Sequence, residues 1–402
     1  MAMVAIAPVA VMVYGEPALL WLLLIAAALV PLSTPLTVMD SKLRIDLKFS
    51  ALARIQTVSG LLRSVAMVGF AGMGLGPLSF MLPMVVCQAY ETVATYRNIN
   101  DRPWKRAARR ELWWDLVRQS KWLIATALAG TMVYFSTPMV CGLFVSADVV
   151  GTYFFAFSIV LQTGLLIAWN VEQVLLPSLS RLKDEPPRQR AASLRALEGL
   201  TLLCAPASMV LGAVFAPLER LIWGGRWEAA VIPLQIASAL YPIFVLHVLP
   251  KSLMTSQARF SALAGATLIS GVLLMTASAL GAWIGGTATS ISLWTGIAQV
   301  MVAVWMLWLG LRPLGITLGN ILGRIFRVWT PTAVVCLGVV WLDTTKLQGF
   351  HAAVRVLICG AIAGMGSMIV LRVISAAALE NVLSVMPMKL SRPARRMLLL
   401  SA

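Results

Sequence analysis

Long apolar runs separated by short polar segments dominate this chain. About 20 apolar residues are enough to cross a bilayer as a helix. Backbone polar groups in lipid must find partners within the protein, so each such run should be helical. The sequence therefore predicts an all-α, polytopic integral membrane protein with eleven spanning helices. The expected spans are residues 18–38, 57–76, 77–95, 122–145, 150–176, 197–216, 229–249, 260–284, 287–311, 328–342 and 352–371.

The first apolar segment differs from the others. Residues Ala2–Tyr14 are apolar but too few to span a bilayer. No positive charge precedes them, so they make a poor signal peptide. We expect this segment to form an N-terminal stub.

Composition agrees with a membrane protein. Hydrophobic residues make up 59% of the 402 residues and charged residues only 12%, which leaves too few charges to cover a soluble globule of this size. A soluble enzyme, a disordered chain and a secreted disulfide scaffold are excluded. The five cysteines lie within apolar runs and show no metal-ligand spacing. No metal or cofactor is expected.

The net charge of +16 predicts the orientation of the chain. If residues 42–54 are cytoplasmic, alternation puts 97–121, 181–195, 250–259, 312–327 and the C-terminal tail on the same side. These segments hold 27 of the 32 basic residues, and the opposite side holds four. Such an imbalance is typical of cytoplasmic loops. We therefore expect a multi-pass protein of the bacterial inner (plasma) membrane with a cytoplasmic C-terminus.

A basic segment at residues 97–121 interleaves seven further Lys and Arg residues after Arg97 with Trp104, Trp113 and Trp114. Nothing breaks a helix from Ala107 onward. This pattern predicts an amphipathic helix on an anionic phospholipid surface, in preference to nucleic acid. The basic C-terminal residues from Lys389 predict a second surface anchor.

No enzyme constellation is present in the sequence. His247 and His351 are the only histidines, and neither has Cys, Asp or Glu at ligand spacing. We interpret His247 as a helix-packing residue. The glycines of Gly69–Gly76 do not form a phosphate loop and are interpreted as a packing or hinge segment.

Polar residues within the spans are the candidate substrate-path residues, since each is costly in lipid. Arg63 can attract a diphosphate or acidic sugar, or can snorkel or pair with an interior carboxylate such as Glu91. Glu91 itself is either a proton or cation site or an interfacial residue.

The 150–176 span carries four further candidates, Gln162, Asn170, Glu172 and Gln173. Gln162 and Gln173 share one helix face and can hydrogen-bond sugar hydroxyls or a neighbouring helix. Glu172 alternatively pairs with Arg181 or Lys183. Asp343 and Arg355 are expected at the outer interface.

One segment carries a family resemblance. Tyr153–Leu182, which closes on Leu-Pro-Ser-Leu-Ser-Arg-Leu, resembles the eighth helix of bacterial polysaccharide flippases. Leu194–Pro206, Arg226–Ile236 and Ser252–Phe260 follow in the family's order, and Lys42–Phe49 resembles an earlier charged loop. The resemblance is to the oligosaccharide-lipid branch of the multidrug/oligosaccharidyl-lipid/polysaccharide exporter superfamily.

The resemblance implies a two-lobe exporter that lacks the first two to three helices. Its parts would be 1–96, an incomplete N-terminal lobe; 97–121, the basic linker; 122–311, a six-helix lobe; and 312–402, a final helix pair and tail. The missing helices would reflect a misplaced start, a truncated gene or a real short form.

The implied function is translocation of a polyprenyl-diphosphate-linked oligosaccharide, such as an O-antigen, capsule or exopolysaccharide unit. Ion-coupled alternating access would drive it without enzyme chemistry, and other glycan assembly proteins are potential partners. A multidrug or lipid-precursor exporter, a glycan polymerase or ligase, and an inactive remnant stay open as alternatives.

The orientation is testable with reporter fusions. Fusions after Asp148, Gly225 and Thr345 should report the outside, and fusions after Arg106, Asp184 and Arg395 the inside. Because alternation links all six positions, one reversed site would contradict the eleven-span arrangement.

Overall fold

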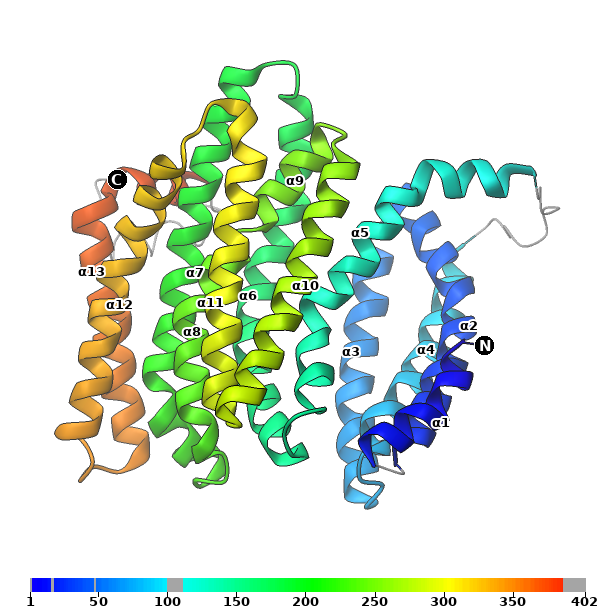
Figure 1. Ribbon diagram of the computed structural model, residues 1–402, viewed down its shortest axis with the longest axis horizontal. Helices are drawn as coiled ribbons and strands as arrows, with labels where there is room; N and C mark the ends of the chain where they lie inside the picture. Colours follow the sequence, from blue (N-terminus) through cyan, green and yellow to red (C-terminus); the bar gives the residue numbers. More distant parts are fainter. Residues whose placement is uncertain (1, 16–17, 47, 100–110, 386–402) are drawn as a thin grey trace. The chain divides into compact units, whose positions relative to one another are not determined.

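The computed structural model describes residues 2–15, 18–46, 48–99 and 111–385, and within these ranges it contains helices and no strand (Figure 1). The α-helices are α1 (Ala2–Tyr14), α2 (Ala18–Ile45), α3 (Phe49–Gly72), α4 (Leu78–Asn98), α5 (Glu111–Cys141), α6 (Ala147–Arg181), α7 (Pro186–Trp223), α8 (Val231–Val245), α9 (Val248–Ser256), α10 (Phe260–Gly285), α11 (Ala288–Leu311), α12 (Leu318–Thr345) and α13 (Ala352–Val385). Two short 3₁₀ helices are η2 (Glu228–Ala230) and η3 (Arg312–Leu314). The all-α prediction is confirmed.

The predicted apolar runs coincide with these helices. In the described part of the chain, nine segments are long and apolar enough to cross a membrane. They include Leu19–Leu43 and eight segments from Ser120 onward, one of which, Glu228–Ser256, combines η2, α8 and α9. Helices α3 and α4 are not among the nine, so the count of eleven spans stays a prediction.

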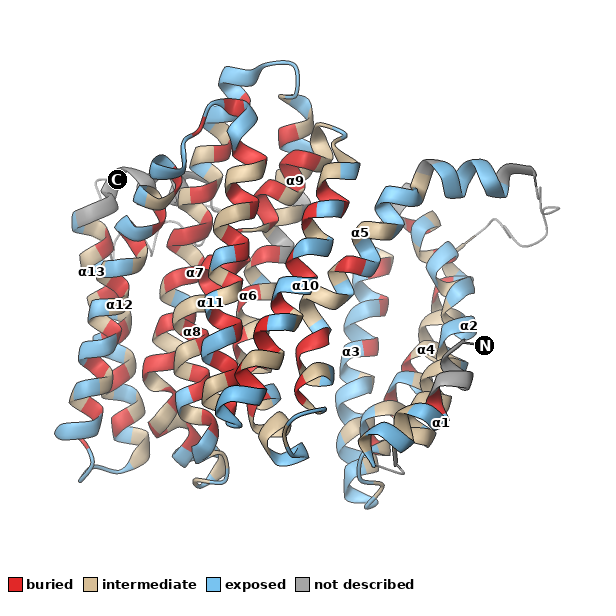
Figure 2. Cartoon of the chain, in the orientation of Figure 1, coloured by how far each residue is buried: buried red, intermediate tan, exposed pale blue. Residues whose placement is uncertain are grey.

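The chain forms two compact units, Met1–Leu116 and Val117–Ala402, which divide within α5. In the first unit, three hydrogen bonds from side chains to backbone carbonyls join α2, α3 and α4. The Cys87 thiol donates to Ser59 (3.4 Å), the Gln88 amide to Leu32 (3.5 Å), and Lys48 to Asn98 (3.0 Å) at the end of α4. Few residues of this unit are buried, as the sparse red in its helices shows (Figure 2).

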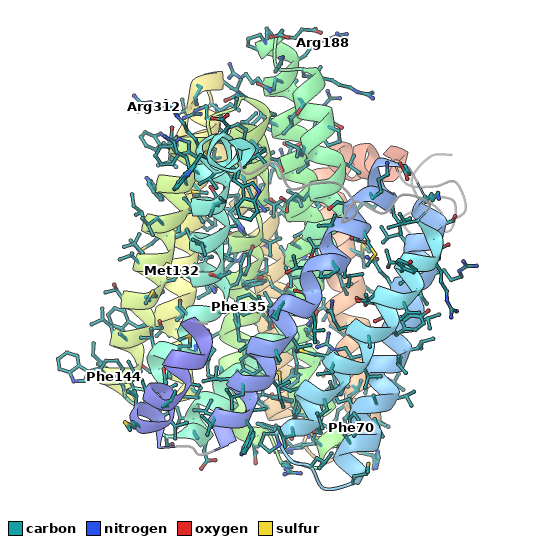
Figure 3. The ribbon with its side chains drawn as sticks, turned by 90° about the vertical axis from the view of Figure 1, so that its right-hand side faces the viewer. Phe70, Met132, Phe135, Phe144, Arg188 and Arg312 are labelled. Atoms are coloured by element: carbon teal, nitrogen blue, oxygen red, sulfur yellow. The ribbon has the colours of Figure 1, made fainter. Side chains whose placement is uncertain are left out.

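The second unit contains the main hydrophobic core, drawn in red along α6 to α11 in Figure 2. Tyr153, Phe215, Tyr241 and Phe244 are among its largest fully buried side chains. Helix ends are fixed locally: the Thr287 hydroxyl accepts from the Ser290 amide (3.2 Å) at the start of α11. In Figure 3, Arg188 and Arg312 lie at one end of this unit and Phe144 toward the other.

A buried ion pair fastens α12 to α13. The Arg355 guanidinium donates through Nε and Nη2 to the two Asp343 carboxylate oxygens, at 2.8 and 2.7 Å. The two side chains are only 4% and 3% exposed. The Arg355 side chain therefore does not extend outward to the membrane surface, whereas the expectation that both residues lie at the depth of the outer interface stays a prediction. A short connection turns α12 back into α13, and this brings two opposite charges from adjacent helix ends together inside the packing.

Breaking this pair should destabilise the protein. Replacing one partner of a buried pair costs on the order of 3–5 kcal/mol, because the remaining charge is left without a partner. Arg355→Met should therefore lower the thermal unfolding temperature in detergent, and Asp343→Leu/Arg355→Met should recover most of it. A double variant as unstable as the single one would contradict this account.

Candidate functional site

A cavity of about 480 Å³ lies within the second unit. Helices α5, α6, α8, α9, α10 and α11 all contribute to its wall. Most of the lining is apolar, but a polar cluster of Tyr134, Glu172, His247 and Lys251 gathers on it. A mostly apolar cavity with a few convergent polar groups is the usual form of a binding site.

Helix α5 forms a wall of the cavity and approaches α10 closely at one point. A Cβ at Gly271 would lie 3.1 Å from the Met132 Cβ, so only glycine allows this spacing without a shift. Further along, the Cys141 thiol donates to the Ser278 carbonyl (3.6 Å). Figure 3 labels Met132 and Phe135 on this helix. These contacts hold α5 beside α10 while residues 123–135 line the cavity.

The break between α8 and α9 positions the polar cluster. Helix α8 ends at Val245 and α9 begins at Val248, with a turn at Leu246 and His247. Pro250 has no N–H to give to the Leu246 carbonyl, which instead accepts from Leu249 (3.1 Å). Interrupted helices of this kind frequently border substrate sites in transporters.

His247 is held in one orientation by both ring nitrogens. Nδ1 lies 2.6 Å from the Phe244 carbonyl oxygen, and Nε2 lies 2.9 Å from the Tyr134 hydroxyl. Because a carbonyl only accepts, Nδ1 carries the hydrogen, and in the neutral imidazole Nε2 therefore accepts from the Tyr134 hydroxyl. This arrangement confirms the interpretation of His247 as a satisfied packing residue.

An ion pair between α6 and α9 completes the cluster. Lys251 Nζ lies 2.7 Å from Glu172 Oε1, and the side chains are 43% and 31% exposed. A second cavity of about 400 Å³ shares Tyr134, Glu172, Leu176 and Lys251 with the first. The ion pair therefore stands on the wall common to the two cavities.

Residues 1–232 match a protein family described as polysaccharide biosynthesis protein. This match covers more than half of the chain. The chain belongs to this family. The expectation of a polysaccharide flippase relative, drawn from the Tyr153–Leu182 segment, is thereby confirmed.

The fold of this family member is similar to that of a solved transporter, "Lipid II flippase MurJ, inward closed conformation". The TM-score is 0.67 at 14% sequence identity, and the match covers 88% of this chain and 74% of that chain. At this identity the likeness concerns the fold alone. No curated protein matches the chain.

Of the predicted site residues of this family member whose side chains the structure describes, Glu172 alone lines the first cavity. Gln162 lies exposed on α6 outside its wall. The backbone of Asn170 and Gln173 belongs to α6, but their side chains lie outside the described residues.

The predicted pairing of Glu172 with Arg181 or Lys183 was wrong. Arg181 is nine residues along the same helix, about 180° around its axis. Lys183 lies beyond the end of α6, about 16 Å along its direction. Lys251, which crosses from a different helix, is the partner instead.

Arg63 and Glu91 lie on α3 and α4 of the first unit, and no ion pair joins them in the described part of the chain. The Cys87–Ser59 hydrogen bond sets the register of this antiparallel hairpin. Arg63 lies four residues after Ser59, and Glu91 lies four residues after Cys87. Because the two helices run in opposite directions, Arg63 and Glu91 are about 12 Å apart along the helix axes. Arg63 is exposed and Glu91 partly exposed.

Sequence reasoning missed Tyr134, His247 and Lys251 as cavity residues. Lys251 was assigned to the cytoplasmic segment 250–259, whereas the structure continues α9 to Ser256. The pair Pro242 and Pro250, which brackets the turn, was the available signal of a broken helix. Among the described residues, no group of three or more His, Cys, Asp or Glu side chains can hold a metal ion.

Proposed function

We propose that this protein moves a polyprenyl-diphosphate-linked oligosaccharide from the inner to the outer leaflet of the bacterial inner membrane. The observation that carries the proposal is the pair of adjoining cavities, with charged and hydroxyl groups on their walls, inside an apolar helical bundle. A glycan needs such a polar path, because unpaired hydroxyls are costly in hydrocarbon. The family description and the flippase-like fold support this substrate class.

The proposed mechanism is ion-coupled alternating access between two helical lobes, without covalent chemistry on the substrate. The apolar outer faces, such as those bearing Leu128, Val334 and Leu337, leave the lipid tail in the bilayer while the glycan passes. The O-antigen, capsule or exopolysaccharide unit would be the cargo. The C-terminus would be cytoplasmic.

The start of α5 is proposed to rest on anionic phospholipid. Trp113 and Trp114 are 66% and 81% exposed, and Arg118 and Lys121 follow on the same helix. This combination suits the headgroup level of a membrane. Residues 100–110 of the 97–121 segment, which include Trp104, lie outside the described residues, as does the tail from Lys389.

Filling the first cavity should block export. Gly130 lines this cavity, and a Cβ built there meets nothing within 4 Å. Gly130→Ala should therefore export normally, whereas Gly130→Trp should reach the membrane but reduce surface glycan at least tenfold. Surface glycan and protein abundance are measured in the same cells. Dye efflux that falls while glycan export persists would favour the multidrug alternative.

Arg63 provides a test in the first unit. An uncompensated arginine within a span costs about 2.5–3.5 kcal/mol by insertion scales, so a purely structural residue there should be replaceable by leucine. Arg63→Leu should abolish glycan export without loss of protein, and Arg63→Lys should retain part of it, since the charge remains but the bidentate fork is lost. Arg54→Leu, an exposed arginine on the same helix, is the matched control. Normal export by Arg63→Leu would remove Arg63 from the path.

A further inference from the structure

The hydroxyl groups on the first cavity wall differ in what they can still donate. Thr126, Thr255, Thr267 and Ser270 each donate to a carbonyl of their own helix, at 2.7–2.8 Å. Tyr134 donates to His247. A hydroxyl has one hydrogen, so these groups can only accept from a ligand in the cavity.

Two groups on the wall keep a hydrogen for a ligand. Lys251 has three N–H donors and a single carboxylate partner, Glu172, in the described part of the chain. Ser252 belongs to the cavity wall and is 2% exposed, and its buried hydroxyl has no hydrogen-bond partner among the described residues. Both residues lie on α9, one after the other. These donors are therefore suited to a ligand that only accepts hydrogen bonds.

The geometry of the Lys251–Glu172 ion pair would allow a ligand anion to replace the Glu172 carboxylate. Both side chains are about a third to two-fifths exposed to the cavities, and a single 2.7 Å contact joins them. An incoming anion can replace the carboxylate without leaving the ammonium group unpaired, and the displaced Glu172 carboxylate, whose side chain is 31% exposed, can be hydrated instead of remaining an isolated buried charge.

We propose that Lys251 and Ser252 form a phosphate-binding site in the second unit and that Glu172 occupies the lysine until the ligand arrives. The ligand is a phosphate or diphosphate ester, which presents only acceptor oxygens and carries the negative charge that an ammonium group prefers. The site rests on the proposed function, because a polyprenyl diphosphate has this headgroup. In the predicted orientation α9 belongs to the cytoplasmic half, where such a lipid would be loaded.

If the ligand exchanges with Glu172, substitutions of Lys251 and of Glu172 should have opposite effects on ligand binding. Removing the lysine charge removes the ligand's main contact, whereas removing the glutamate charge removes its competitor. A purely structural ion pair would give two losses instead. The sign of the Glu172 effect therefore separates ligand exchange from structural pairing.

Equilibrium binding to the full chain in nanodiscs tests the proposal. The probes are undecaprenyl diphosphate, undecaprenol and inorganic pyrophosphate. Lys251→Gln should weaken binding of the diphosphate lipid by about 10- to 100-fold, as expected for a charge-assisted hydrogen bond. Glu172→Gln should tighten it, and Ser252→Ala should weaken it by less than Lys251→Gln. Binding of undecaprenol should be unchanged throughout.

Two controls guard against loss of fold. Lys346→Gln changes an exposed lysine at the other end of the unit and should leave binding unchanged. Glu172→Gln and Lys251→Gln/Glu172→Gln both lack the ion pair and differ only in the cation, so the double variant should bind the diphosphate lipid more weakly than the single one. Pyrophosphate that binds as tightly as the lipid would assign the site to free phosphates.

Equal weakening by Lys251→Gln and Glu172→Gln, or no effect of either, would overturn the phosphate site. The proposed function would survive that result if Gly130→Trp still blocked export. Conversely, the predicted binding pattern in a protein whose variants all export normally would leave the phosphate site standing and refute the function.

Discussion

A backbone N–H or C=O without a partner costs several kcal/mol in hydrocarbon, and this constraint shapes the whole protein. It accounts for the helical form of nearly every described residue. It also accounts for the behaviour of serine and threonine within the spans, where Thr201, Ser278 and Thr332 return their hydrogen to a carbonyl four residues back. Where the helix does break, between α8 and α9, the Phe244 carbonyl is met by the His247 ring. The break therefore costs little and bends the chain at the cavity wall.

The same constraint explains why the sequence predicted the helices well. Each of the eleven apolar runs coincides with a helix or, for 229–249, with η2, α8 and the start of α9. Length and hydropathy carry this information because a span has to match the bilayer. The details at helix ends were less accessible: α5 begins within the basic segment and continues without interruption to Cys141. Nothing in composition distinguishes a surface helix that stops from one that turns into a span.

Partners across helices could not be predicted, for a physical reason. In a membrane protein both the lipid-facing and the buried faces are apolar, so hydrophobic periodicity does not reveal which face packs inward. Arg355 and Asp343 were expected at the outer interface, and the sequence did not reveal that they pair with each other within the packing. Glu172 was recognised as a polar residue inside its span, but Lys251 lies about 80 positions away and becomes its neighbour only through the fold. The sequence can therefore identify polar residues that belong to a site, but which of them come together depends on tertiary contacts.

A comparison of two of the ion pairs shows how geometry separates a structural role from a proposed functional one. Arg355 meets Asp343 through two hydrogen bonds, and both side chains are almost fully buried. No ligand can approach that pair without unpacking α12 from α13. Lys251 meets Glu172 through one contact between a flexible ammonium and a carboxylate, beside open volume on both sides. The planar guanidinium of Arg355 suits a stable ion pair. The flexible ammonium group of Lys251 suits an ion pair whose anionic partner can be exchanged. The Lys251–Glu172 pair therefore fits the proposed ligand exchange, whereas the Arg355–Asp343 pair fits a structural role.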